Sequence, residues 1–212
     1  MRFAELLATP GVHEESVLRS SFGFMAFHGG NLERVTDEIA RVAAERSGAS
    51  LYAVVQEYPL RNHLPSIEVN PRSSSVLAAF LEHVDIVIAI HGYGRDGLWT
   101  SILAGGSNRV LAKICCDALA VRLPDYIFVR AVEDIPKELR GMHPENPVNR
   151  PRFGGVQLEL PPRVRGLTPQ AATMERIDGR IKPTNDLIEA LIEAATSWQS
   201  LPTTIQQTSL TA

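Results

Sequence analysis

The chain has 212 residues, of which 44% are hydrophobic and 21% are charged, a composition typical of one globular domain. The formal net charge of -3 argues against nucleic-acid binding, and no apolar run approaches the roughly 18–20 residues that a membrane span needs. The N-terminal stretch lacks the apolar core of a signal peptide, and the only cysteines, Cys115 and Cys116, are neighbours, so a cytoplasmic protein with reduced thiols is expected.

The first strong signal is the apolar run at residues 22–28 (FGFMAFH), which has the length of a strand and precedes Gly29-Gly30. Apolar residues then recur at helical spacing from Leu32 to Ala43, with Asn31 as the expected N-cap. Gly48 ends this pattern. The sequence therefore predicts a strand, a tight turn and a helix.

Strands and helices are expected to alternate through the rest of the chain. The expected strands cover residues 51–55, 84–90, 126–129 and 156–160, and the expected helices 73–82, 108–122 and 185–198. This alternation predicts one α/β domain over residues 1–198, a three-layer α/β/α sandwich with a mixed, largely parallel sheet. Residues 133–154 are expected to form a long loop of functional importance or without order, and the polar tail 199–212 to be disordered.

Polar side chains stand at the ends of three expected strands: His28, His91 and Glu159. Ligands of such sheets bind beyond the carboxyl ends of the strands. The turn at Gly29-Gly30 would bring Glu33 back beside His28. Two histidines and one carboxylate form the ligand set of an open catalytic zinc site, in which water takes the fourth position. A histidine at a strand end is often structural, so the pattern alone leaves both roles open.

Three segments of the chain resemble the poly-γ-glutamate hydrolase family, first known from bacteriophages: FMAFHGGNLERVTDEIA, VDIVIAIHGYGRDG and NPVNRPRFGGVQLEL. The family pattern His-Gly-Gly-x-(Ile/Leu)-Glu-x-x-Thr is complete here, and the resemblance covers about residues 22–165. The family is similar to the zinc carboxypeptidases of the carboxypeptidase A type. The resemblance implies a Zn²⁺-dependent hydrolase of γ-glutamyl or peptide-like amide bonds.

The resemblance also implies roles for individual residues. His28, Glu33 and His91 match the metal ligands. Glu159 matches the general base that activates water. Asn149 and Arg150 resemble a pair that holds a substrate carboxylate, and Arg150 is also a candidate for stabilising the developing oxyanion.

Other polar residues near these motifs have no firm role. His63, in the sequence HLPS, stands where the family has a histidine-containing loop, but the match is poor and its role stays open. Four arginines near the motifs would together attract an anionic glutamyl substrate, although each one singly is expected to be solvated: Arg95, Arg152, Arg163 and Arg165.

Three other functions remain as alternatives. One is a zinc deacylase of small or tRNA-linked acyl substrates, although the net charge gives no support for tRNA. Another is an inactive module that binds metal. The third is a dinucleotide-binding protein, because Gly92, Gly94 and Gly97 spell G-x-G-x-x-G after a strand. A second glycine pair at Gly105-Gly106 limits the helix that this fingerprint requires, so the dinucleotide reading is the weakest.

Overall fold

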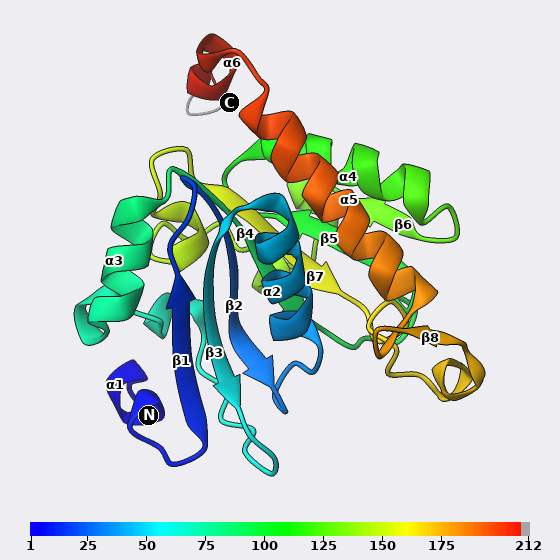
Figure 1. Cartoon of the computed structure of the whole chain (residues 1–212), viewed down its shortest axis with the longest axis horizontal. Coiled ribbons are helices and arrows are strands. Elements are labelled where there is room, and N and C mark those ends of the chain that lie inside the picture. Colours follow the sequence, from blue (N-terminus) through cyan, green and yellow to red (C-terminus); the bar gives the residue numbers. More distant parts are fainter. Residues whose placement is uncertain (209–212) are drawn as a thin grey trace.

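The computed structural model describes residues 1–208, and a seven-stranded mixed sheet runs through its centre (Figure 1). From one edge to the other the strands are β1 (Val12–Val17), β3 (Ser50–Gln56), β2 (Phe22–Gly30), β4 (Ile86–Gly92), β7 (Gly155–Leu160), β5 (Ser101–Gly105) and β6 (Ile127–Val129). The four central strands β3, β2, β4 and β7 are parallel, whereas β1 and β5 run antiparallel to β3 and β7. The expected mixed, largely parallel sheet is confirmed.

Helices cover both faces of this sheet. The helices α2 (Thr36–Ser47), α4 (Arg109–Arg122) and α5 (Lys182–Gln199) contribute to one hydrophobic core, while α1 (Phe3–Leu7) and α3 (Ser75–His83) contribute to the other. In Figure 1, α5 crosses in front of the sheet between α2 and α4. The expected three-layer α/β/α architecture is therefore confirmed.

The central strands are apolar along their whole length because both of their faces are buried. In β2, Phe24 and Ala26 belong to the core under α2, α4 and α5, whereas Met25 and Phe27 belong to the core under α1 and α3. Successive side chains of a strand point to opposite faces, so a strand between two helical layers needs apolar residues at every position. This requirement explains the run FGFMAF.

The helix after β2 starts later than the sequence predicts. It begins at Thr36 rather than near Leu32, and Val35 before it has a left-handed backbone with φ 79°. The preceding residues form a turn held by two backbone hydrogen bonds, from Glu33 N to His28 O at 2.9 Å and from Asn31 N to Gln56 O at 2.7 Å. Glu33 consequently lies in this turn and not in the first turn of a helix.

The segment after β4 contains no helix where a dinucleotide site would need one. Turns and irregular backbone lead from Gly92 through Gly97 to β5, a strand that the sequence did not predict. The pyrophosphate of a dinucleotide rests on a helix N-terminus. The G-x-G-x-x-G spacing therefore has no dinucleotide-binding context here.

The remaining elements are short. Two strands, β8 (Arg176–Ile177) and β9 (Arg180–Ile181), form a separate hairpin. The 3₁₀ helices are η1 (Ser66–Glu68), η2 (Pro71–Ser73), η3 (Val132–Asp134), η4 (Lys137–Leu139), η5 (Pro147–Asn149) and η6 (Pro169–Thr173). Within the tail expected to be disordered, α6 (Thr203–Thr208) forms; backbone bonds to Pro202 O begin it, and Gln206 Nε2 donates to Trp198 O at 3.0 Å. Residues 209–212 lie outside the described residues.

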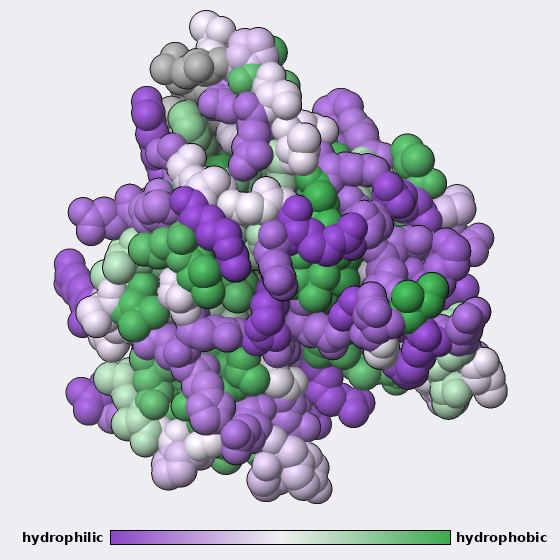
Figure 2. Space-filling model, viewed as in Figure 1, coloured by the Kyte–Doolittle hydropathy of each residue, from purple (hydrophilic) through white to green (hydrophobic). Residues whose placement is uncertain are grey.

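The surface seen from the side of α2 and α5 is mostly hydrophilic, with hydrophobic groups in patches interrupted by polar side chains (Figure 2). The two cysteines, Cys115 and Cys116, are buried in α4 as free thiols, as expected. Within residues 1–208, no helix combines the length and the apolar character that crossing a membrane requires.

Candidate metal centre and its cavity

Two histidines meet at one edge of the sheet because their strands are parallel neighbours. His28 stands near the end of β2 and His91 near the end of β4, and β2 pairs directly with β4. Both side chains are buried, and their ring centroids lie 5.0 Å apart. The pairing of β2 and β4 thus fixes two nitrogen donors at the carboxyl edge of the sheet.

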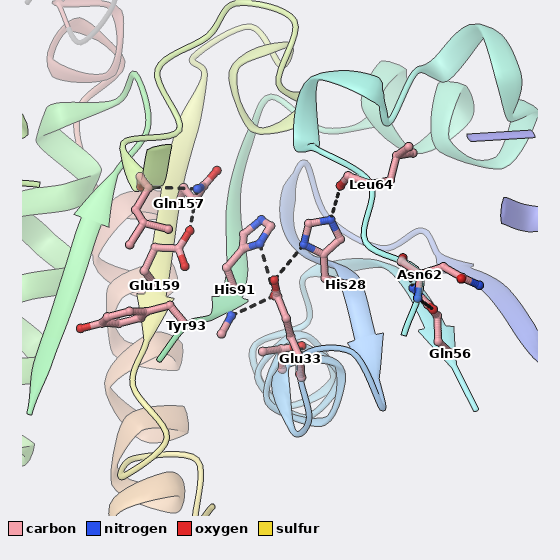
Figure 3. A network of polar contacts seen from close by, with 12 residues as sticks. His28, Glu33, Gln56, Asn62, Leu64, His91, Tyr93, Gln157 and Glu159 are labelled. Atoms are coloured by element: carbon pink, nitrogen blue, oxygen red, sulfur yellow. Dashed lines mark hydrogen bonds and ion pairs between the residues drawn. The ribbon is translucent and has the colours of Figure 1, made fainter. Parts of the chain in front are cut away.

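Glu33 reaches back between the two histidines from the turn after β2, as Figure 3 shows. This turn needs a glycine at position 30, where φ is 69° and an added Cβ would lie 2.3 Å from Gln56 O. Glu33 Oε1 lies 2.9 Å from His28 Nδ1, and Glu33 Oε2 lies 3.3 Å from His91 Nδ1. The Gly92 amide also donates to Glu33 Oε2, at 2.9 Å.

The three side chains fit a metal ion by distance and by donor chemistry. One ligand atom from each of His28, Glu33 and His91 lies within 4.8 Å of the others. His28 Nε2 is 2.8 Å from the carbonyl oxygen of Leu64, which only accepts, so Nε2 carries the proton. In the neutral ring, the lone pair of Nδ1 then faces a lone pair of the Glu33 carboxylate, and a cation between them resolves this contact.

The ionisation of these residues also favours a cation. Burial alone would raise the pKa of the Glu33 carboxyl, but the charges of His28 and His91 and their hydrogen bonds hold it well below the usual 4.5. Burial would lower the pKa of His91, yet the Glu33 carboxylate raises it above 6.5. The pocket therefore contains an ionised carboxylate that attracts positive charge.

Glu159 faces the same edge from the neighbouring strand. The register of β4 and β7 pairs His91 directly with Glu159, which is only 4% exposed. Gln157 Nε2 donates to Glu159 Oε1 at 2.8 Å, and Asn146 Nδ2 donates to Gln157 Oε1 at 2.8 Å. Burial raises the pKa of Glu159 above 4.5, although His91 and the hydrogen bond from Gln157 oppose the shift. A buried carboxyl with a raised pKa is a stronger base than a solvated one.

A cavity of about 1140 Å³ opens over these residues, and we call it the active-site cavity. His28, Glu33, His91 and Glu159 line it together with much of the loop segment 132–146. The place of this segment in the cavity lining agrees with the expectation that the loop 133–154 has functional importance. The cationic residues in the lining are Lys137 and Arg140.

His63 is a cavity residue for which the sequence predicted no firm role. Its ring centroid lies 5.1 Å from that of His28, and it lines the active-site cavity beside Pro65. Burial, with the nearby charge of His28, lowers its pKa below 6.5. A mostly neutral imidazole at this position can both donate and accept a hydrogen bond. The HLPS sequence was the signal that pointed to it.

The structure does not bring Asn149 and Arg150 into the lining of this cavity. Asn149 is used internally: its side-chain oxygen accepts from Ser107 N, and its amide donates to Gly141 O and His143 O. Arg150 is exposed and donates to Glu145 O at 3.2 Å. Both residues lie in or next to η5, and its three side-chain hydrogen bonds make Asn149 an anchor of this loop.

The four other arginines have different environments. Arg95 pairs with Glu138 on the surface, Arg152 lies over the ring of Phe153, and Arg163 lies over the ring of Tyr126. Arg165 differs from the expectation of a solvated side chain, because it is only 7% exposed. It lies beside Gly92, the residue that follows the candidate ligand His91 in the sequence.

Comparison with known proteins gives one family and a set of similar folds. The model of the family described as poly-gamma-glutamate hydrolase matches residues 3–193 of this chain. A structure described as bacteriophage poly-gamma-glutamate hydrolase is 23% identical, with a TM-score of 0.76 over 91% of each chain. The zinc-free apo form of a protein named YNDL is 21% identical, with a TM-score of 0.67 over 90% of this chain and 92% of its own. At these identities the two structures show that this chain shares their fold. A search of curated proteins gave no match to the sequence.

Proposed function

The chain belongs to the poly-γ-glutamate hydrolase family, and we propose that it cleaves γ-glutamyl amide bonds at a zinc centre held by His28, Glu33 and His91. Its membership makes it a hydrolase of amide bonds. The observation that carries the proposal is the convergence of two imidazole Nδ1 atoms on the Glu33 carboxylate at the floor of the active-site cavity. Zinc is favoured over Mg²⁺ or Ca²⁺ because nitrogen donors dominate the set.

A zinc ion held by these three residues would act as a Lewis acid and would lower the pKa of water in the site to about 7. The chain's own residues orient these ligands. Leu64 O fixes the His28 tautomer that leaves Nδ1 free, and the Gly92 amide orients the Glu33 carboxylate. Leu64 and Gly92 are not ligands themselves, but their contacts hold His28 and Glu33 in position before a metal binds.

Glu159 is the general base in this proposal. Its carboxylate accepts a proton from the attacking water and delivers it to the amine nitrogen as the amide C–N bond breaks, which leaves a carboxylate and an amine. Three features support this role: its register position beside His91, its place in the cavity lining, and its raised pKa. Gln157, itself held by Asn146, keeps the carboxylate oriented.

The test begins with metal analysis of the purified protein and continues with assays of the zinc-loaded enzyme. We expect about one zinc per chain and hydrolysis of γ-linked oligoglutamate in preference to α-linked oligoglutamate. Acyl esters and N-acyl amines that lack a glutamyl group serve as deacylase controls. Zinc binding without hydrolysis of any amide would indicate an inactive metal-binding module. Faster hydrolysis of the acyl controls than of γ-linked oligoglutamate would favour a deacylase.

A further inference from the structure

A second cavity lies beside the active-site cavity, and we call it the arginine cavity. Its volume is about 490 Å³, and Arg34, Arg61 and Arg165 line it. Both cavities are also lined by Leu32, Glu33 and Gly92, so the wall between them contains the ligand Glu33. A substrate bound at the metal centre would therefore lie beside three arginines.

The arginine cavity combines three parts of the chain that are distant in sequence. Arg34 is in the turn before α2, Arg61 follows β3, and Arg165 follows β7. A hydrogen bond from Asn31 Nδ2 to Leu60 O at 2.9 Å links the first two loops. The fold thus gathers positive charge that no local motif in the sequence encodes.

The lining carries an excess of positive charge that the described residues do not neutralise. Its only described carboxylate is Glu33, whose oxygens already contact His28, His91 and the Gly92 amide. In the described part of the chain, the guanidinium groups of Arg34 and Arg61 form no hydrogen bond or ion pair. Arginines in such a position are available to bind an external anion.

Arg165 forms the rigid base of this cavity. It donates from Nη1 to Arg34 O at 3.1 Å and from Nη2 to Tyr93 O at 3.0 Å. Its Nε atom is buried without a hydrogen-bond partner in residues 1–208. Its guanidinium fits against Gly92 only because that residue lacks a Cβ, which would lie 2.5 Å from Nη1. Because these bonds already hold Arg165 and the backbone of Arg34 in place, less conformational entropy is lost when an anion binds.

We propose that the arginine cavity binds α-carboxylates of the glutamyl chain on one side of the scissile amide. This inference rests on the proposed function, because the amide must lie over the metal centre for the neighbouring residues to reach the arginines. A γ-linked chain carries one free carboxylate per residue, and the planar guanidinium group matches a carboxylate through two hydrogen bonds. The arginine cavity then takes the recognition role that the sequence suggested for Asn149 and Arg150.

The kinetic test uses Arg34→Gln, Arg61→Gln and the double variant, with Arg72→Gln as the matched control. Arg72 is also exposed, and it lines neither cavity. On γ-linked pentaglutamate, each single substitution should raise KM about tenfold with kcat changed less than about twofold, and the control should leave both unchanged. With the α-carboxylates converted to amides, the three variants and wild type should have equal KM values. An unchanged KM in the double variant, or equal losses on both substrates, overturns the inference.

A binding measurement separates this inference from the proposed function. Calorimetry with γ-linked pentaglutamate would use zinc-loaded Glu159→Gln protein, with and without the two arginine substitutions. We expect binding that weakens about 100-fold in the double arginine variant and that depends less on salt there. If wild type cleaves no γ-glutamyl bond but this binding behaves as expected, the proposed function fails and the arginine cavity stands. If pentaglutamate does not bind, or binds equally to both proteins, the arginine cavity is refuted even where hydrolysis is observed.

Discussion

His91 and Glu159 are direct partners across the parallel strands β4 and β7. Side chains at paired positions of adjacent strands point to the same side of the sheet. The pairing therefore places a candidate metal ligand beside a candidate general base, although these residues are 68 positions apart in the sequence. A slip of one residue in this register would turn Glu159 to the opposite face and remove it from the active-site cavity.

The first prediction separates metal binding from proton transfer. Glu159→Gln keeps the shape of the side chain but removes the base, so zinc content should persist while kcat falls by about 10²–10⁴-fold. Zinc is measured by elemental analysis and kcat on a γ-glutamyl substrate. A loss of less than about tenfold would show that another group accepts the proton.

The second prediction concerns the ligand set. His91→Ala removes one of the two imidazole donors, so zinc affinity and activity should fall together, with affinity weakened at least about 100-fold. His13→Ala is the matched control, because His13 is exposed, pairs with Glu57 and does not line the active-site cavity. Competition with a chelator gives the affinities. Equal zinc affinity in the two variants would contradict the proposed centre.

The third prediction concerns the pH dependence of the metal-free protein. The raised pKa of His91 means that its contact with Glu33 stabilises the fold fully below pH 6.5, and that this stabilisation is lost as the pH rises through the higher folded-state value. The lowered pKa of Glu33 adds stabilisation that is present above pH 4.5 and lost as the pH falls through its folded-state value. The contact should thus stabilise the chelated protein most between pH 4.5 and 6.5.

The measurement is the difference in unfolding free energy between wild type and His91→Gln, both treated with chelator. This difference should be larger at about pH 5.5 than at about pH 8.5, since only the charged imidazole gains from Glu33. In zinc-loaded wild type, stability should persist at the higher pH because metal binding requires neutral histidines. A difference that grows with pH would show that His91 is neutral in the metal-free protein.

The fourth prediction tests how Gln157 orients the general base. Gln157→Met removes the hydrogen bond to Glu159 Oε1, a bond that lowers the pKa of Glu159. The pKa should therefore rise, and the acidic limb of the kcat/KM profile should move to higher pH, because a base must be deprotonated to act. A reduced rate with an unshifted acidic limb would indicate that Gln157 only fills space.

The fifth prediction concerns Asn149, which the structure uses as a loop anchor. Asn149→Ala removes the partner of Ser107 N and of Gly141 O, whereas His143 O still accepts from Asn146 N, so the free energy of unfolding should fall by about 1–3 kcal/mol. KM should change little in folded protein at low temperature. A large rise in KM without loss of stability would instead support the substrate-binding role expected from the sequence.

Local sequence patterns determined most of the architecture. The apolar runs of β2 and β4 predicted strands, and Asn108 marked the start of α4, where its side chain caps Leu111 N. These predictions succeeded because strand burial and helix capping depend on residues close in sequence. The grouping of His28, Glu33 and His91 was also predictable, since the turn at Gly30 and the ends of two parallel strands bring them together.

Only the tertiary structure decided which charged residues surround this centre. Nothing local to Arg150 shows that it lies outside the active-site cavity, and nothing local to Arg165 shows that it is buried against Gly92. An arginine has the same intrinsic preferences in a solvated loop and in a buried one; its environment depends on loops that fold back from distant segments. The sequence by itself therefore determined the candidate ligands and the sheet that carries them, whereas the long-range packing of loops determined the cavity walls and their charge.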